Sequence, residues 1–355
     1  MPDHAELPDA AAEPGTRGTE RRETEWLAAH VFYHAPLEPV ITDVISPLVT
    51  ELTGLGLADE YFFLRYWDSG PHLRFRVLPP DGPSRHRSRT LVERRIRRFL
   101  DTRPAATTID EAEYRRTAEP IARLENEPGY SPLRPNNSVA FLPYRRERLR
   151  YGYGAAITAV ERHFTESSRI ALGLLASGPD PDQRFTAAFS MLTLAWLCGT
   201  DDPAARLGGA GKARTNVGAL DAGELERLWH DQRDTLCTLI ESLRAVVARS
   251  DALGSGDLAD WVRSLDRLRR VLDAEAAAGR YVPPTPGGAG GAPAGPAPAS
   301  LPAMDICAHL FCNRIGLSLA GESYVRALAM RAIRETETET GGGPRAVAGD
   351  SCPLQ

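Results

Sequence analysis

The chain has 355 residues, of which 42% are hydrophobic, 25% charged and 7% aromatic, close to the averages of globular proteins. This composition excludes fibrous, collagen-like and wholly disordered proteins. With 42 Lys and Arg against 47 Asp and Glu, the net charge is -5, and it predicts no direct nucleic-acid or membrane partner. Five cysteines at irregular spacing predict reduced thiols, and therefore a cytoplasmic protein.

The two ends of the chain differ in composition from the middle. Residues 1–23 and 336–355 are rich in charged and small side chains, and they are predicted to be disordered tails. A single domain is predicted between them, over residues 24–335. Within it, residues 282–303 are rich in Pro and Gly, which predicts a flexible loop.

The predicted elements fall into two groups along the chain. Aromatic and β-branched residues predict strands at 30–34, 61–67 and 72–78, with a helix at 41–55 and a short extended segment at 139–144. Helical periodicity follows at 155–176, 184–198, 224–248, 257–278 and 303–336. This order predicts an α+β fold, in which a small, mainly antiparallel sheet packs against a helical body. No glycine fingerprint follows a strand, so no nucleotide cofactor, and no other cofactor, is expected.

The segment 61–78 has the pattern of a hairpin, with Asp68–Pro71 as a four-residue link. Alternation along its second strand places His72, Arg74 and Arg76 on one face. If the link sets the register, Arg65 lies opposite Arg74, and three arginines share that face. Such a cluster suits an anion pocket, and the alternative is a solvated face paired with Asp or Glu.

Two further segments carry polar residues in unusual settings. In Tyr144–Gly152, Glu147 and Arg150 are spaced to share one side of a helical turn, either in a site or as a surface ion pair. In 306–314, His309 lies in a mostly apolar helix, where it is either a proton shuttle or a hydrogen-bonded core residue. The neighbouring cysteines point to different sides of this helix, so no metal site is expected.

In chain order, the sequences FFLRYWDSGPHLRFR, YRRERLRYGYG and HLFCNRIG resemble those of the thiopeptide-type bacteriocin biosynthesis family. They are similar to the C-terminal glutamate-elimination domain of class I lantibiotic dehydratases of the nisin dehydratase type, in stand-alone form. The resemblance covers about residues 25–335. It implies that the chain expels glutamate from glutamylated Ser or Thr of a ribosomally made precursor peptide, leaving dehydroalanine or dehydrobutyrine.

The resemblance also implies roles for individual residues. The implied catalytic residues that grip glutamate or stabilise developing charge are Arg74 or Arg76 and Arg150. His309 is implied to move the proton, and Glu147 to orient the arginines or the substrate. The implied substrate-binding residues are Arg65, His72, Tyr144, Tyr151 and Asn313. The sequence departs from the family pattern at Arg145, Arg146 and Tyr153, which affects substrate preference.

The implied partners are a precursor peptide with its leader and a separate dehydratase subunit that adds glutamate from glutamyl-tRNA. A homodimer is compatible with the sequence. One alternative function is that of the thiopeptide pyridine synthases, which join two dehydroalanines in a formal aza-[4+2] cyclisation and release the leader. Another is a non-catalytic partner that binds the precursor peptide.

Overall fold

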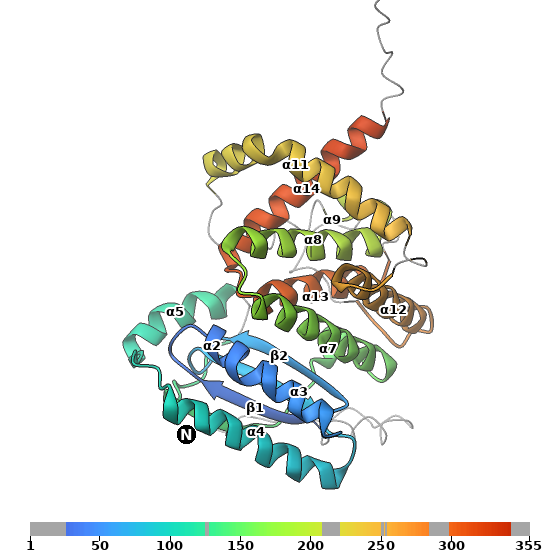
Figure 1. The fold of residues 1–355 in the computed structure, drawn as a ribbon. Helices are drawn as coiled ribbons and strands as arrows, with labels where there is room; N and C mark the ends of the chain where they lie inside the picture. The colour runs from blue at the N-terminus through green and yellow to red at the C-terminus, as the bar shows by residue number, and fades with distance from the viewer. Residues whose placement is uncertain are drawn as a thin grey trace, which may run out of the picture.

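The fold is given by a computed structural model, which describes residues 26–124, 128–207, 221–249, 252, 254–283 and 298–341 (Figure 1). The predicted tail 1–23 and most of the predicted loop 282–303 lie outside the described residues. The elements, in chain order, are β1 (Leu27–Phe32), α2 (Glu38–Val40), the π-helix η1 (Ile41–Ile45), α3 (Ser46–Gly54), β2 (Glu60–Tyr66), β3 (His72–Leu78), α4 (Gly82–Thr102), α5 (Glu111–Leu124), β4 (Ser138–Phe141), α6 (Arg148–Tyr151), α7 (Ala155–Ala176), α8 (Pro181–Gly199), α9 (Pro203–Leu207), α11 (Ala222–Ala248), α12 (Asp257–Ala277), α13 (Leu301–Arg314) and α14 (Leu319–Gly341). The helix α14 therefore extends into the predicted C-terminal tail.

The described strands form one antiparallel sheet in the order β2-β3-β1-β4. With helices between β1 and β2 and between β3 and β4, this is the split β-α-β arrangement. Figure 1 shows this sheet with α3 and α4 at one end of the molecule and α8, α11 and α14 at the other. The predicted α+β class is confirmed.

One face of the sheet is the core face. Alternation directs Val31, Phe63 and Phe75 to this side, and each of them is fully buried. Ile41 and Ile96, from the helical segments that cover this face, are also fully buried and belong to the same core cluster. The opposite face of β3 carries the His and Arg residues of the hairpin.

The helix α4 was not predicted, although the chain contains signals for it. Asp81 caps the helix by accepting a hydrogen bond from the Ser84 amide at 2.7 Å, and Pro83 occupies the first turn. Apolar positions such as Leu91 and Ile96 then form a buried stripe. The many arginines between these positions obscured the pattern.

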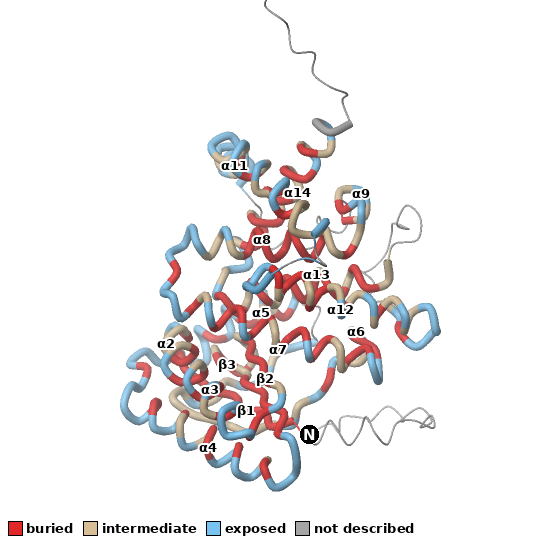
Figure 2. The backbone as a smooth tube through the Cα atoms, turned by 45° about the vertical axis from the view of Figure 1, so that its right-hand side comes forward, coloured by how far each residue is buried: buried red, intermediate tan, exposed pale blue. Residues whose placement is uncertain are grey.

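The helices of the helical body begin and end near the residues predicted from the sequence. The helix α7 spans the predicted residues 155–176, and α8 contains the predicted residues 184–198 and is buried from Ala188 to Trp196 (Figure 2). Asp180 and Gln183 form a capping box at the start of α8. No helix in the described part of the chain is long and apolar enough to cross a membrane.

The hairpin register differs from the predicted one by one residue. The observed pairs are Tyr66 with His72 and Leu64 with Arg74, so the link is one residue longer than predicted. Ser69 and Gly70 both have positive φ, and the Gly70 amide donates to the Trp67 carbonyl at 3.0 Å. The shift moves Arg65 to the core face, so the predicted face of three arginines is wrong.

The outer edge of β2 is closed by the helical body. The Asn313 side chain on α13 accepts from the Arg65 amide at 2.9 Å and donates to the Arg65 carbonyl at 3.0 Å. On α7, the Ser168 hydroxyl accepts from the Phe63 amide at 3.3 Å, and the buried Arg314 guanidinium donates to that hydroxyl at 3.1 Å. These bonds satisfy a sheet edge that would otherwise carry unpaired backbone groups.

Replacing Asn313 with Ala should lower the free energy of unfolding by about 1–3 kcal/mol, because both backbone groups of Arg65 lose their partner. Asn313→Asp should fall between wild type and Ala, since it keeps the acceptor for the amide and loses the donor. Urea denaturation measures both. An unchanged unfolding midpoint for Asn313→Ala would show that this contact does not hold the sheet to the helical body.

Candidate active site

The candidate site is the sheet face opposite the core face. Its polar residues, which we call the basic face, are His30 on β1 and His72, Arg74 and Arg76 on β3. The register pairs His30 directly with Arg74. His30, His72 and Arg76 are each at most 9% exposed, so their charge states are governed by burial.

The two histidines form a hydrogen-bonded, neutral pair. Burial is the main cause that lowers the pKa of His30 to about 2 and that of His72 to about 4. His72 Nδ1 lies 2.9 Å from the Gly70 carbonyl oxygen, which can only accept, so this nitrogen carries the proton. His72 Nε2 is then an acceptor, and the donors that face it are His30 Nδ1 at 3.2 Å and Arg74 Nε at 3.4 Å. The His30 Nε2 lone pair is therefore left as an acceptor without a partner among the described residues.

The two arginines are held by aromatic rings. The Arg74 guanidinium carbon lies 3.2 Å from the centroid of the Tyr66 ring, and that of Arg76 lies 4.4 Å from the Tyr144 ring. Neither arginine forms an ion pair with a carboxylate of the described residues. Arg76 Nε is buried without a hydrogen-bond partner in that part of the chain. Burial lowers the pKa of both groups, and the nearby Glu147 acts in the opposite direction.

The segment after β4 is fixed above the basic face by a buried ion pair. Arg146 donates to both carboxylate oxygens of Glu161 on α7, at 2.8 and 2.5 Å, and the two side chains are 0% and 1% exposed. This pair anchors the loop that carries Tyr144 and Glu147. Glu147 pairs with Arg150 at 2.7 Å, as their spacing predicted, and both side chains are half exposed.

His309 is oriented by a chain of charged side chains between α13 and α14. Its Nδ1 lies 2.6 Å from Glu322 Oε2, and Arg326 donates to the other oxygen of Glu322 at 2.7 Å. Arg326 also donates to Asp305 at 2.6 Å. The Glu322 carboxylate is buried, but the proximity of His309 and Arg326 lowers its pKa. The carboxylate holds the ring so that Nε2 is the nitrogen available to a substrate.

The structure brings only some of the predicted site residues together. Arg74, Arg76, His72, Tyr144, Glu147 and Arg150 gather at the basic face and the loop above it. No hydrogen bond or ion pair of the described residues joins His309 to these arginines. It lies one helical turn before Asn313 on α13, and its described hydrogen bond is with Glu322 on α14.

Three predicted substrate-binding residues have structural positions instead. Arg65 lies on the core face, where it pairs with Glu38 at 3.2 Å and donates to the Arg314 carbonyl at 3.2 Å. Asn313 binds the backbone of β2. Tyr151 is 2% exposed and packs edge-on against Phe164. Alternation and helical periodicity could not reveal these positions, because each depends on a contact between distant segments.

Two residues of the site were missed by the sequence analysis. His30 lies in the segment HVFYH, whose pattern identified a strand but gave no sign of the partner His72. Glu322 lies in an amphipathic helix, where a carboxylate is usually solvated. Its pairing with His309 depends on the turn between α13 and α14, which brings the two helices together.

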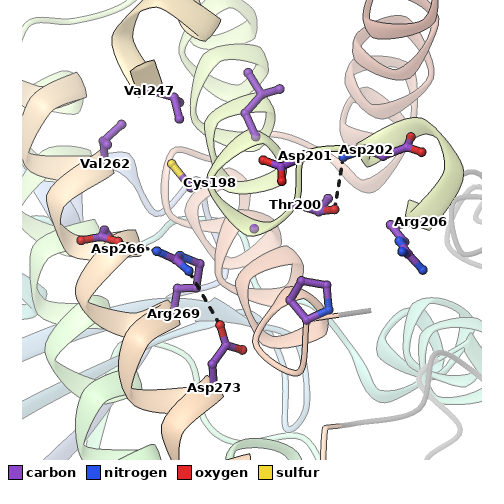
Figure 3. A pocket seen from close by; sticks show the side chains of 13 residues that line it. Cys198, Thr200, Asp201, Asp202, Arg206, Val247, Val262, Asp266, Arg269 and Asp273 are labelled. Carbon is purple, nitrogen blue, oxygen red and sulfur yellow. Dashed lines mark hydrogen bonds and ion pairs between the residues drawn. The ribbon is translucent and has the colours of Figure 1, made fainter. Parts of the chain in front are cut away.

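A separate cavity of about 510 Å³ lies at the C-terminal end of α8 and along the middle of α12 (Figure 3). Figure 3 shows Asp266, Arg269 and Asp273 on its wall, with Arg269 between the two carboxylates, at 2.9 Å from Asp266 and 4.0 Å from Asp273. None of the residues predicted for the site lines this cavity. Four Asp and two Arg residues line the cavity, so its lining carries more negative than positive charge. The basic face is therefore the better candidate site for an anionic leaving group.

The sequence of the chain was compared with family models and with curated proteins. Residues 26–333 match the model of the family described as lantibiotic biosynthesis dehydratase C-term. The chain belongs to this family. No curated protein matches the chain significantly.

Three solved structures have a fold similar to that of this chain. The pyridine synthase TbtD from thiomuracin biosynthesis aligns with a TM-score of 0.71 and 22% identity, over 89% of this chain and 99% of that one. TsrL aligns with a TM-score of 0.60 and 19% identity, over 88% and 95%. The tRNA-dependent lantibiotic dehydratase MibB from Microbispora sp. 107891 aligns with a TM-score of 0.54 and 17% identity, over 93% of this chain and 29% of that one. At these identities the likeness establishes the fold.

The neutral histidine pair predicts a pH dependence of stability. Below about pH 6.5 the unfolded chain takes up protons on His30 and His72, but the folded pair does not, because its pKa values are lowered. The free energy of unfolding should therefore fall as the pH falls from 6 to 5. His30→Phe should make this slope shallower by about 1 kcal/mol per pH unit, measured by urea denaturation. Identical slopes would mean that His30 is protonated in the folded protein.

Proposed function

We propose that the protein is the elimination component of a lantibiotic-type dehydratase, which expels glutamate from glutamylated Ser or Thr of a precursor peptide. The observation that carries this proposal is the pair Arg74 and Arg76, which have no carboxylate partner among the described residues. The reaction removes a proton from the peptide Cα, forms the Cα–Cβ double bond and breaks the bond between Cβ and the ester oxygen. Glutamate leaves through that oxygen.

Charge develops during this reaction where the arginines can stabilise it. The bound glutamyl ester has one free carboxylate, and the leaving glutamate has two, so a negative charge appears as the ester bond breaks. One arginine of the basic face holds the free carboxylate, and the other donates to the developing one. Stabilisation that grows toward the transition state accelerates the reaction, whereas equal binding of ground and transition state does not.

The remaining groups supply the proton transfer and the recognition of glutamate. His309 takes the Cα proton on Nε2, while Glu322 stabilises the imidazolium that forms. His30 is too weakly basic for that role, because its pKa is about 2. Its unused Nε2 instead accepts a hydrogen bond from the glutamate ammonium group. Glu147, which neighbours the arginines, orients them and limits the net positive charge.

A second candidate function is pyridine synthesis, joining two dehydroalanines with release of the leader. The specific observation in its favour is the likeness to TbtD, since the alignment covers 99% of that chain and has a higher TM-score than the alignment with MibB. If the protein is a pyridine synthase, Arg74 and Arg76 donate hydrogen bonds to carbonyl groups of the peptide. Holding two alkenes together supplies much of the rate enhancement, so no strong base is required.

The two functions are separated by the substrate that is consumed. Purified protein incubated with a glutamylated peptide should release free glutamate and lower the peptide mass to that of the dehydrated form. The same protein incubated with a leader-linked peptide that contains two dehydroalanines should leave it unchanged. Mass spectrometry measures both reactions. A new pyridine ring with loss of the leader, and no released glutamate, would replace the first proposal with the second.

Substitutions on the hairpin and on α13 test the catalytic roles proposed for Arg74 and His309. Arg74→Ala and His309→Ala should each lower kcat for glutamate release by about 100-fold, because each removes a group that acts in the transition state. The matched control is Arg65→Ala on the opposite face, which should lower stability and leave kcat within about threefold. Circular dichroism at the assay temperature verifies folding. A folded His309→Ala variant with normal turnover would exclude this histidine as the base.

A further inference from the structure

The sheet has one closed edge and one open edge. At β4, the Leu142 amide donates to the Ala28 carbonyl at 3.1 Å, and His30 lies directly opposite Ala140. Alternation of the ladder therefore directs the N–H and C=O groups of Val139 and Phe141 away from β1. In the described part of the chain these groups have no hydrogen-bond partner. The equivalent groups on β2 are bound by α7 and α13.

This open edge has little of the usual protection besides its short length of four residues. Exposed edge strands are commonly short, carry charged residues or proline, contain a bulge, or are covered by another element. The sequence of β4 is Ser-Val-Ala-Phe, which contains neither a charge nor proline. Its side chains are only partly buried. The edge is therefore a template on which an extended peptide can pair.

Positive charge surrounds this edge, although the chain as a whole has a net charge of -5. Arg89 on α4 is exposed, and its guanidinium carbon lies 4.3 Å from the centroid of the Phe141 ring. Arg134 comes before the strand and lies 5.6 Å from the Phe32 ring, and the exposed Arg145 follows the strand. None of the three arginines forms an ion pair with a carboxylate of the described residues.

We propose that the open edge of β4 binds an acidic, extended segment of the substrate peptide as a fifth strand. This inference rests on the proposed function only in taking a peptide as the substrate. The backbone of the peptide pairs with Val139 and Phe141, and its carboxylates reach Arg89 on one side of the sheet and Arg134 on the other. The strand leads directly into the loop of Tyr144 and Glu147, so the bound segment lies beside the basic face.

Two other occupants explain the observations less well. A second copy of the chain, paired edge to edge through β4, would bring the same arginines of both copies close together, which is unfavourable. A nucleic acid would satisfy the arginines but would leave the backbone groups of Val139 and Phe141 without the regular pairing that a peptide strand supplies. Charge and edge geometry together favour an acidic peptide.

The test measures binding of a defined probe to the full-length protein. The probe is a fluorescein-labelled peptide of about 14 residues with alternating Glu and Val, and its control has Gln in place of Glu. Fluorescence anisotropy at low and moderate salt gives Kd for each. Wild-type protein should bind the Glu peptide more tightly, with an advantage that declines as salt screens the charges.

Three variants distinguish pairing of the peptide with the β4 edge from non-specific electrostatic attraction. Val139→Pro removes an outward N–H without removing a bond to β1, and it should weaken binding of the Glu peptide about fivefold. Arg89→Glu should weaken it by a similar factor. The matched control, Arg98→Glu, makes the same charge change on an exposed position of α4 that faces away from β4, and it should leave Kd within about twofold.

Several results would overturn the inference. Equal losses for Arg89→Glu and Arg98→Glu, or no loss for Val139→Pro, would show that the edge does not pair with the peptide. Binding of a 20-nucleotide poly(U) probe in preference to the Glu peptide would assign the patch to nucleic acid. A wild-type dimer that Val139→Pro dissociates in sedimentation would assign it to self-association. Because these measurements need no turnover, they stand apart from the assay of glutamate release.

Discussion

The contact of Asn313 with the backbone of β2 is the constraint on which the arrangement of the site depends. A strand edge must have its N–H and C=O groups satisfied, and an amide side chain is one of the few that can both donate and accept. By binding Arg65 in this way, α13 is held against the sheet, and its preceding turn carries His309. The contact joins the helical body that contains His309 to the sheet that contains Arg74 and Arg76.

Burial then determines the chemical character of the basic face. The histidine pair is kept neutral, and the arginines are kept between aromatic rings without carboxylate partners in the described part of the chain. A cation held this way retains unused hydrogen-bonding capacity for an incoming anion, at the expense of stability. The ion pair of Arg146 and Glu161 does not offset this cost, because it is itself fully enclosed and burial raises the pKa of Glu161 in spite of the bidentate contact.

The same fold is found in a pyridine synthase and in part of a lantibiotic dehydratase. Their likeness to this chain therefore does not distinguish elimination from cyclisation, since a fold can support several reactions. The distinction depends on individual side chains, and we propose that the two arginines and the pair of His309 with Glu322 decide it. The two sheet edges also differ: α7 and α13 bind the edge of β2, whereas the outward groups of Val139 and Phe141 on β4 have no partner in the described part of the chain.

The sequence alone determined the fold class, the family and most of the helical body, because these depend on local periodicity and on motifs of neighbouring residues. It also placed His72, Arg74 and Arg76 on one face, since alternation along a strand is local. The tertiary structure decided the register that moved Arg65 to the core face, and it decided the pairing of His30 with His72 and of His309 with Glu322. Each of these depends on contacts between segments far apart in the chain, and a one-residue change in a turn is enough to exchange the two faces of a strand.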